Sequence, residues 1–176
     1  VYGNGKYIAV GYSRGYASVV ASEDGITWTN VSLAAILSRK SIFDIAYGNG
    51  NYVILDSTTL YVTADFTNVI VKRLDSVPTT NGKICYGKDR FIVSCRDKDY
   101  DSKNGTEWRE ITKELNCKLS NINYINSEII GISSLRKLIK LDIYTIDEMK
   151  NDITELNSAL YPVGIVLAFV NGFDPN

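Results

Sequence analysis

The side chains that could carry out covalent chemistry are few in this chain, and their spacing matches no catalytic pattern. The 176 residues include no histidine, so a Ser-His or Cys-His nucleophile cannot form within the chain. The three cysteines, Cys85, Cys95 and Cys117, lack metal-ligand spacing and predict buried thiols. A carboxylate pair of the glycosidase type is left open by the sequence. We predict no catalytic residues, no metal site and no cofactor, and we expect the chain not to be an enzyme.

Two polar segments carry the same residue types at the same spacing. They contain Ser22, Asp24, Gly25 and Trp28 in one case, and Ser102, Asn104, Gly105 and Trp108 in the other. Residues 63–68 hold the equivalent place between them, without the glycine and the tryptophan. The pattern predicts a polar hairpin turn, in which Ser and Asp side chains bond the backbone, Gly takes a left-handed angle and Trp packs beneath. These residues are therefore predicted to be structural.

A short hairpin sequence recurs along the chain. Copies begin at Tyr2, Tyr47, Tyr86 and Tyr124, at intervals of 45, 39 and 38 residues. In the first two copies an Asn-Gly pair follows Tyr-Gly, and polar residues replace that pair in the later ones. Asn and Gly tolerate the positive φ angles of tight hairpins. Repetition at this period predicts an array of similar structural units.

The repeats predict an all-β fold made of β-propeller blades. In the second repeat, strands are expected over 41–47, 51–57, 59–64 and 68–73, and four short antiparallel strands are the content of one blade. The charged stretch 96–101 is interpreted as a solvated loop. We assign residues 1–144 to about four blades of 38–45 residues. The polar turns resemble the Asp-box, or bacterial neuraminidase, repeat, which implies the same fold.

That resemblance also raises a sialidase-like function. The family's active site implies an arginine cluster for the substrate carboxylate, a tyrosine nucleophile beside a glutamate, and an acidic general acid. None of the seven arginines lies in the family's Arg-Ile-Pro context, and no Tyr/Glu pair matches its motif. A glycan-binding or sialidase-like propeller of a cell-surface or secreted protein is kept as the alternative function.

Charge and hydropathy exclude two classes of partner. The formal net charge of −1 lacks the basic excess expected for nucleic-acid binding. The longest apolar run, near residues 163–170, is too short to span a bilayer. We expect neither nucleic-acid binding nor membrane insertion.

From residue 145 the apolar period changes to that of a helix. Residues 145–160 are predicted to form a trimerising coiled-coil helix with a seam of apolar residues at steps of 3 and 4, namely Ile146, Met149, Ile153, Leu156 and Leu160. Such a short helix is marginal alone. It must bury its seam either in a homotrimer or against the preceding repeats.

The last segment, 161–176, begins with Tyr161-Pro162-Val163-Gly164 and continues into an apolar strand. Directly after a coiled-coil heptad, this motif resembles the start of the collar domain of bacteriophage tail fibres. The resemblance implies a structural and host-adhesion component of a phage tail or phage-derived particle, located in the virion or an extracellular particle. Its implied partners are a bacterial surface glycan or envelope polymer and other phage tail or baseplate proteins. Loops 12–16 and 96–100 are the candidate contacts.

Overall fold

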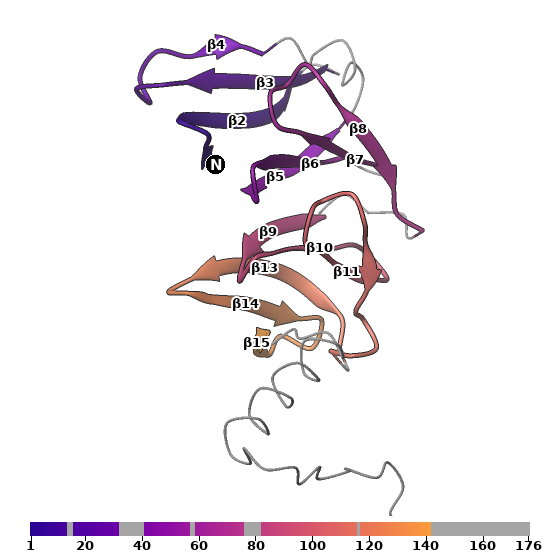
Figure 1. The fold of residues 1–176 in the computed structure, drawn as a ribbon. Helices are drawn as coiled ribbons and strands as arrows, with labels where there is room; N and C mark the ends of the chain where they lie inside the picture. Colours follow the sequence, from indigo (N-terminus) through magenta and orange to yellow (C-terminus); the bar gives the residue numbers. More distant parts are fainter. Residues whose placement is uncertain (14–15, 32–40, 57–58, 76–81, 116, 142–176) are drawn as a thin grey trace, which may run out of the picture. The chain divides into compact units, whose positions relative to one another are not determined.

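The structure, a computed structural model, describes residues 1–13, 16–31, 41–56, 59–75, 82–115 and 117–141. All secondary-structure elements of the described residues are β-strands, as predicted, and they form antiparallel sheets (Figure 1). Residues 1–141 make up one compact part. The predicted helix 145–160 and the predicted collar segment 161–176 lie outside the described residues. None of the described elements is a helix that could span a membrane.

The strands form four repeat units, each an antiparallel meander in chain order. Unit 1 contains β1 (Tyr2–Gly3), β2 (Lys6–Ser13), β3 (Tyr16–Ser22) and β4 (Thr29–Asn30). Unit 2 contains β5 (Ile42–Gly48), β6 (Asn51–Asp56), β7 (Thr59–Thr63) and β8 (Ile70–Arg73). Unit 3 contains β9 (Lys83–Gly87), β10 (Arg90–Ser94), β11 (Asp99–Ser102) and β12 (Arg109–Glu110). Unit 4 contains β13 (Leu119–Ile125), β14 (Glu128–Ser133) and β15 (Leu138–Leu141).

Each unit opens with the recurrent hairpin in the same register. The tyrosine of the first strand pairs with the residue five positions later, as Tyr47 pairs with Tyr52 and Tyr86 with Phe91. Both central turn residues have positive φ in every copy, 47° and 77° at Asn49 and Gly50 for example. Two positive φ angles define the hairpin turn whose twist matches the flanking strands. The predicted turn chemistry is therefore confirmed.

Neighbouring units pack against each other through apolar faces. A single sheet would leave these apolar side chains exposed to water. Unit 1 and unit 2 share a buried cluster that includes Ile8, Val19 and Ile54. Unit 2 and unit 3 share a second cluster that includes Leu55 and Val93. Strand β6 contributes to both clusters, and its central residues, 52–55, are apolar and buried.

The glycine after each repeat tyrosine has a role in this packing. A Cβ on Gly3, Gly48 or Gly87 would overlap the ring of the next unit's tyrosine, which is Tyr47, Tyr86 or Tyr124 respectively. None of these three glycines has a positive φ. Tyr52 also donates a hydrogen bond from its hydroxyl to the carbonyl of Gly3 across the first junction. In units 1, 2 and 3 the glycine of the Tyr-Gly pair is thus required by contact with the next unit.

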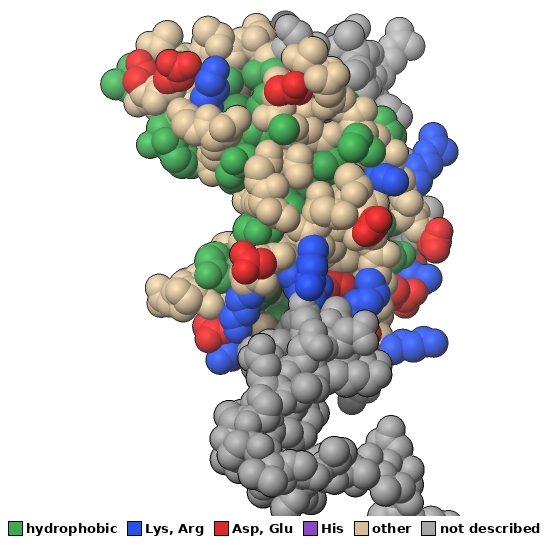
Figure 2. Space-filling model, viewed as in Figure 1, with side chains coloured by type: hydrophobic (Ala, Val, Ile, Leu, Met, Phe, Trp, Pro, Cys, Tyr) green, Lys and Arg blue, Asp and Glu red, His purple; other side chains and the backbone are tan. Residues whose placement is uncertain are grey.

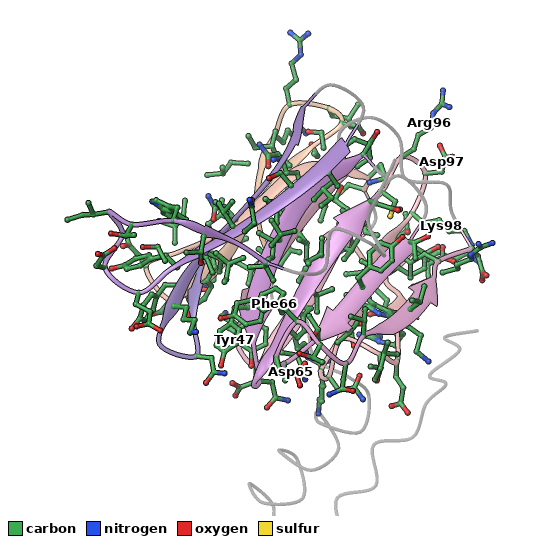
Figure 3. All side chains as sticks on the ribbon, turned by 90° about the horizontal axis from the view of Figure 1, so that it is seen from above. Tyr47, Asp65, Phe66, Arg96, Asp97 and Lys98 are labelled. Atoms are coloured by element: carbon green, nitrogen blue, oxygen red, sulfur yellow. The ribbon has the colours of Figure 1, made fainter. Side chains whose placement is uncertain are left out.

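The interpretation of residues 96–101 as a solvated loop is wrong for its second half. Arg96 and Asp97 are exposed and lie at the margin of the fold (Figure 3). Asp99 and Asp101 instead belong to strand β11 and are fully buried. Carboxylates can be buried when cations and backbone N–H groups compensate their charge, and both do so here.

Candidate ligand-binding groove

The first strands of units 2, 3 and 4 border a groove of about 550 Å³. Strands β5, β9 and β13 carry the side chains along it, and these strands neighbour one another in successive units. The lining side chains used below are Asp44, Lys83, Cys85, Asn121, Asn123 and Tyr124. A groove that crosses equivalent strands of three units suits an extended ligand with repeating groups.

Two asparagines on β13 present oriented amides to this groove. Asn121 Oδ1 accepts a hydrogen bond from the N–H of Ile122 at 2.9 Å, and Asn123 Oδ1 accepts one from the N–H of Tyr124 at 2.9 Å. Both asparagines are exposed, and Tyr124 beside them is 41% exposed. Because each carbonyl oxygen is held by the backbone, the amide nitrogens remain available as donors. Two donors on the same face of one strand can bind hydroxyl-rich polymers.

The other end of the groove carries a pair of opposite charges. Lys83 Nζ lies 3.7 Å from Asp44 Oδ2, and the N–H of Ile84 donates to the same oxygen at 3.2 Å. Burial, with the charge of Asp44, raises the pKa of the Cys85 thiol to about 12. The thiol therefore stays protonated at neutral pH and is a poor nucleophile. The groove offers binding groups rather than an activated nucleophile.

The predicted polar turns have one shared geometry. Asp24 Oδ1 accepts from the N–H groups of Ile26 and Thr27 at 2.8 and 2.7 Å, and the N–H of Gly25 donates to Ser22 Oγ at 2.8 Å. These bonds lower the pKa of Asp24 well below its usual range. The turn at residues 102–108 repeats the pattern with Asn104 in place of the aspartate.

The two tryptophans of these turns have different surroundings. Each indole N–H donates to the carbonyl of the turn glycine, at 3.3 Å for Trp28 and 2.8 Å for Trp108. Trp108 is half-buried against the cluster between units 2 and 3. Trp28 was also expected to pack beneath its turn, yet it is 42% exposed.

The turn of unit 2 keeps the same hydrogen bonds although it lacks the glycine. Asp65 accepts from the N–H groups of Thr67 and Asn68, and Thr63 takes the place of serine. Phe66 occupies the glycine position with a φ of 62°. Its ring lies 4.6 Å from that of Tyr52, centroid to centroid, in the cluster between units 1 and 2. Aromatic packing compensates an angle that bulky residues rarely adopt.

Two arginines that could have bound an acidic ligand are directed at a carboxylate of the chain itself. Arg90 Nη1 lies 2.6 Å from Asp101 Oδ2, and Arg109 Nε lies 3.0 Å from Asp101 Oδ1. Arg109 also pairs with Glu114 at 2.5 Å. Arg90 and Asp101 are both buried. This cluster stabilises strand β11. No motif in the sequence indicates it, since its members extend from residue 90 to residue 114.

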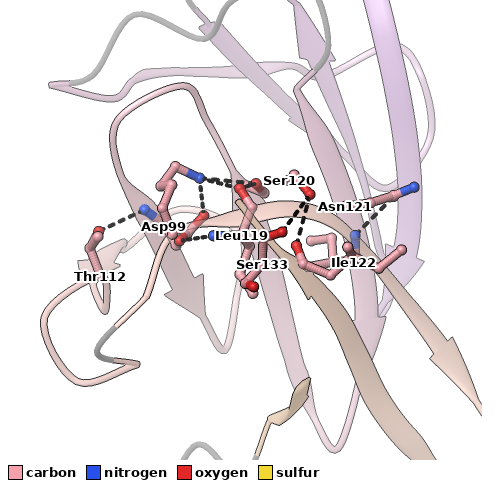
Figure 4. Close-up of polar contacts among 10 residues, drawn as sticks. Asp99, Thr112, Leu119, Ser120, Asn121, Ile122 and Ser133 are labelled. Atoms are coloured by element: carbon pink, nitrogen blue, oxygen red, sulfur yellow. Dashed lines mark hydrogen bonds and ion pairs between the residues drawn. The ribbon is translucent and has the colours of Figure 1, made fainter. Parts of the chain in front are cut away.

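A second buried carboxylate joins unit 3 to unit 4 (Figure 4). Lys118 Nζ lies 2.6 Å from Asp99 Oδ1, and the N–H of Leu119 donates to Asp99 Oδ2 at 3.0 Å. The hydroxyl of Ser94 donates to the carbonyl of Leu119 at 3.0 Å. The described residues contain no group of His, Cys, Asp and Glu side chains arranged to hold a metal ion.

Comparisons with known proteins give structural likeness and no sequence family. No family model matches the chain, and no curated protein matches it. A structure titled "YCF48 bound to D1 peptide" is 14% identical with a TM-score of 0.47, and the match covers 76% of this chain and 52% of that one. PorZ, a bacterial surface component of the type-IX secretion system of Porphyromonas gingivalis, is 13% identical with a TM-score of 0.50. That match covers 81% of this chain and 20% of PorZ.

These findings define the class of protein. The four sheets, each a meander of short antiparallel strands, and the likeness to PorZ place the described residues in the β-propeller class. The chain spans about half the length of the YCF48 structure and a fifth of PorZ. The likeness concerns the fold, because identities of 13 and 14% carry no functional assignment.

Proposed function

We propose that this chain is a non-enzymatic adhesive and structural component of a bacteriophage tail or phage-derived particle, and that its β-propeller units bind a bacterial surface polymer in the groove along β5, β9 and β13. The observation that supports the binding proposal is the pair of exposed, oriented amides of Asn121 and Asn123 along this groove. The tail assignment rests on the sequence resemblance of residues 161–176 to a collar domain.

Three observations favour binding over catalysis. Arg90 and Arg109 are paired with Asp101, so neither is directed toward an external carboxylate. The Cys85 thiol in the groove has a raised pKa. The polar turns hold their carboxylates with backbone N–H groups, which leaves Asp24 and Asp65 as structural acceptors. A purified chain is expected to leave fluorogenic sialosides and bacterial polysaccharides uncleaved.

The direct test is binding of the full chain to purified bacterial envelope polysaccharides, measured by titration calorimetry. The double variant Asn121→Ala, Asn123→Ala is expected to weaken binding about tenfold, since it removes two hydrogen-bonding groups of roughly 0.5–1.5 kcal/mol each. Asn30→Ala is the matched control, because Asn30 is an exposed asparagine on β4 outside the groove. Equal affinities for the double variant and the control would contradict the groove as the binding site.

A further inference from the structure

Repeat unit 1 exposes a face that the later units bury. We call the set Tyr2, Tyr7, Ala9 and Trp28 the open face. Tyr2 and Tyr7 are paired in register, with ring centroids 4.7 Å apart, and they are 59% and 43% exposed. Figure 2 shows hydrophobic side chains at the surface over unit 1, in the upper part of the view. Charged side chains are more frequent lower in the view, over units 3 and 4.

In units 2 and 3 the equivalent tyrosines, Tyr47 and Tyr86, are half-buried, and the aromatic residues paired with them are buried against the unit before. Tyr47 and Tyr52 make the same ring pair at 4.6 Å, and Tyr52 is 1% exposed. Tyr86 and Phe91 repeat it at 4.7 Å, with Phe91 wholly buried. The open face therefore has the register and ring geometry of an interface that occurs elsewhere in the same molecule.

The turn glycines show the same difference. A Cβ on Gly105 would lie 2.7 Å from Val53 Cγ2, so the turn of unit 3 is pressed against unit 2. A Cβ on Gly25 would contact only the ring of Tyr7, in its own unit, with Cε2 at 3.7 Å. Asn49 of unit 2 further donates to the carbonyl of Lys103 at 3.2 Å. Unit 1 thus retains the residues of a junction while lacking the neighbouring sheet.

We propose that the open face docks a further four-stranded repeat unit of this same type, whose inner strand places a glycine under the ring of Tyr2. We infer this contact from the three junctions between units 1, 2, 3 and 4. In each of them a glycine lies under the tyrosine ring of the next unit. A larger residue at that position would collide with the ring and keep the sheets apart.

A second copy of units 1–4 does not meet this requirement. Its glycines at positions 3, 48 and 87 are already covered by Tyr47, Tyr86 and Tyr124. In unit 4 the residue after the tyrosine is Ile125, whose side chain would occupy the space that Tyr2 needs. The docked unit is therefore one outside residues 1–141, with glycine at this position.

The test adds such a unit to the full chain. Residues 42–85 are duplicated and joined directly before Tyr2, so that Gly48 of the added copy lies where the proposal requires a glycine. The added segment contains no tryptophan, and Trp108→Phe in the background leaves Trp28 as the only reporter. Acrylamide quenching of Trp28 fluorescence is expected to fall about twofold or more as the new sheet excludes water from the open face.

The matched control places Gly48→Ile in the added copy alone, which imitates Ile125. Its Trp28 is expected to be quenched as strongly as in the parent chain. Equal protection by both added copies would overturn the glycine requirement. A folded added sheet, seen by circular dichroism, that leaves Trp28 unprotected would overturn the docking. A second fusion places residues 83–123 before Tyr2, with Gly87 as the glycine and Trp108→Phe in the added copy as well, so that Trp28 is again the only reporter. Failure of both added sheets to fold would also contradict the proposal, because the open face should stabilise them.

Discussion

The glycine that follows the repeat tyrosine in units 1, 2 and 3 lies where any side chain would collide with the tyrosine of the next unit. Gly48→Ala would place a methyl group inside the ring of Tyr86, so we expect a loss of roughly 1–3 kcal/mol in the free energy of unfolding. Gly11→Ala is the control, because Gly11 also lies in a strand and has no atom within 4 Å of an added Cβ. Urea unfolding of both variants measures the difference, and equal losses would contradict the contact.

The aspartate of the unit 2 turn makes stability depend on pH. Backbone N–H groups of Asn68 and Thr67 lower the pKa of Asp65 from 3.8 to about 2. Between these two values the unfolded chain binds a proton that the folded chain does not. The contribution of Asp65 is therefore complete above about pH 4 and is lost as the pH falls toward 2.

The equivalent residue of unit 3, Asn104, suggests a substitution that tests the pH dependence contributed by Asp65. It holds the same two types of backbone N–H with an amide oxygen that does not titrate in this range. Asp65→Asn is expected to keep the turn and to flatten the pH dependence of stability between pH 4 and 2. Unfolding by urea at several pH values in that interval checks it, with the parent chain as reference. An unchanged slope would assign the pH dependence to other carboxylates.

At the scale of the element, strand β11 is held by paired charges rather than by apolar side chains. Asp99 is fully buried and its oxygens are bonded by Lys118 and the N–H of Leu119. Removing one partner of a buried pair leaves an uncompensated charge, which costs about 3–5 kcal/mol. Lys118→Met is therefore expected to destabilise the chain by that amount, measured by urea unfolding.

A paired variant distinguishes the charge from the packing. Adding Asp99→Asn to Lys118→Met removes the unpaired carboxylate and should recover a large part of the lost stability. A double variant that is no more stable than the single one would show that Lys118 acts through its aliphatic stem and not its charge.

The strand positions and hairpin turns could be predicted because their causes are local. Alternating apolar runs and Asn-Gly pairs specify strand, turn and register within a few residues, as in the hairpin where Tyr47 pairs with Tyr52. The burial of the aspartates in β11 could not be predicted in this way. The charge of Asp99 is compensated by Lys118, which lies 19 residues later, directly before strand β13. The role of Gly48 was equally hidden, because its partner Tyr86 lies 38 residues later.

The groove shows the same limit. Asn121 and Asn123 carry no motif, and only the adjacency of β5, β9 and β13 brings them beside Asp44 and Lys83. Charge and aromatic character make residues 96–100 candidate contacts, yet Tyr100 is buried in the cluster between units 2 and 3. The side chains of Tyr12 and Tyr16 lie outside the described residues.

At the scale of the whole molecule, the proposed function depends on how many grooves act together. One shallow, polar groove offers few strong contacts, so a single chain is expected to bind a surface polymer weakly. Three grooves on one particle would raise the avidity without any new contact, since the second and third binding events become intramolecular. The seam predicted over residues 145–160 is the segment that would join three chains.

This oligomeric state is directly measurable. The full chain is expected to be a trimer by light scattering, and the double variant Ile153→Glu, Leu156→Glu a monomer, because charges at seam positions cannot be buried between helices. The isolated groove should be unaffected: the variant is expected to retain the affinity for a short oligosaccharide and to lose avidity for polymer-coated surfaces. If the full chain is a monomer, the seam does not join chains, and adhesion must then depend on one groove. If the variant remains a trimer, the contacts that join the chains lie outside Ile153 and Leu156.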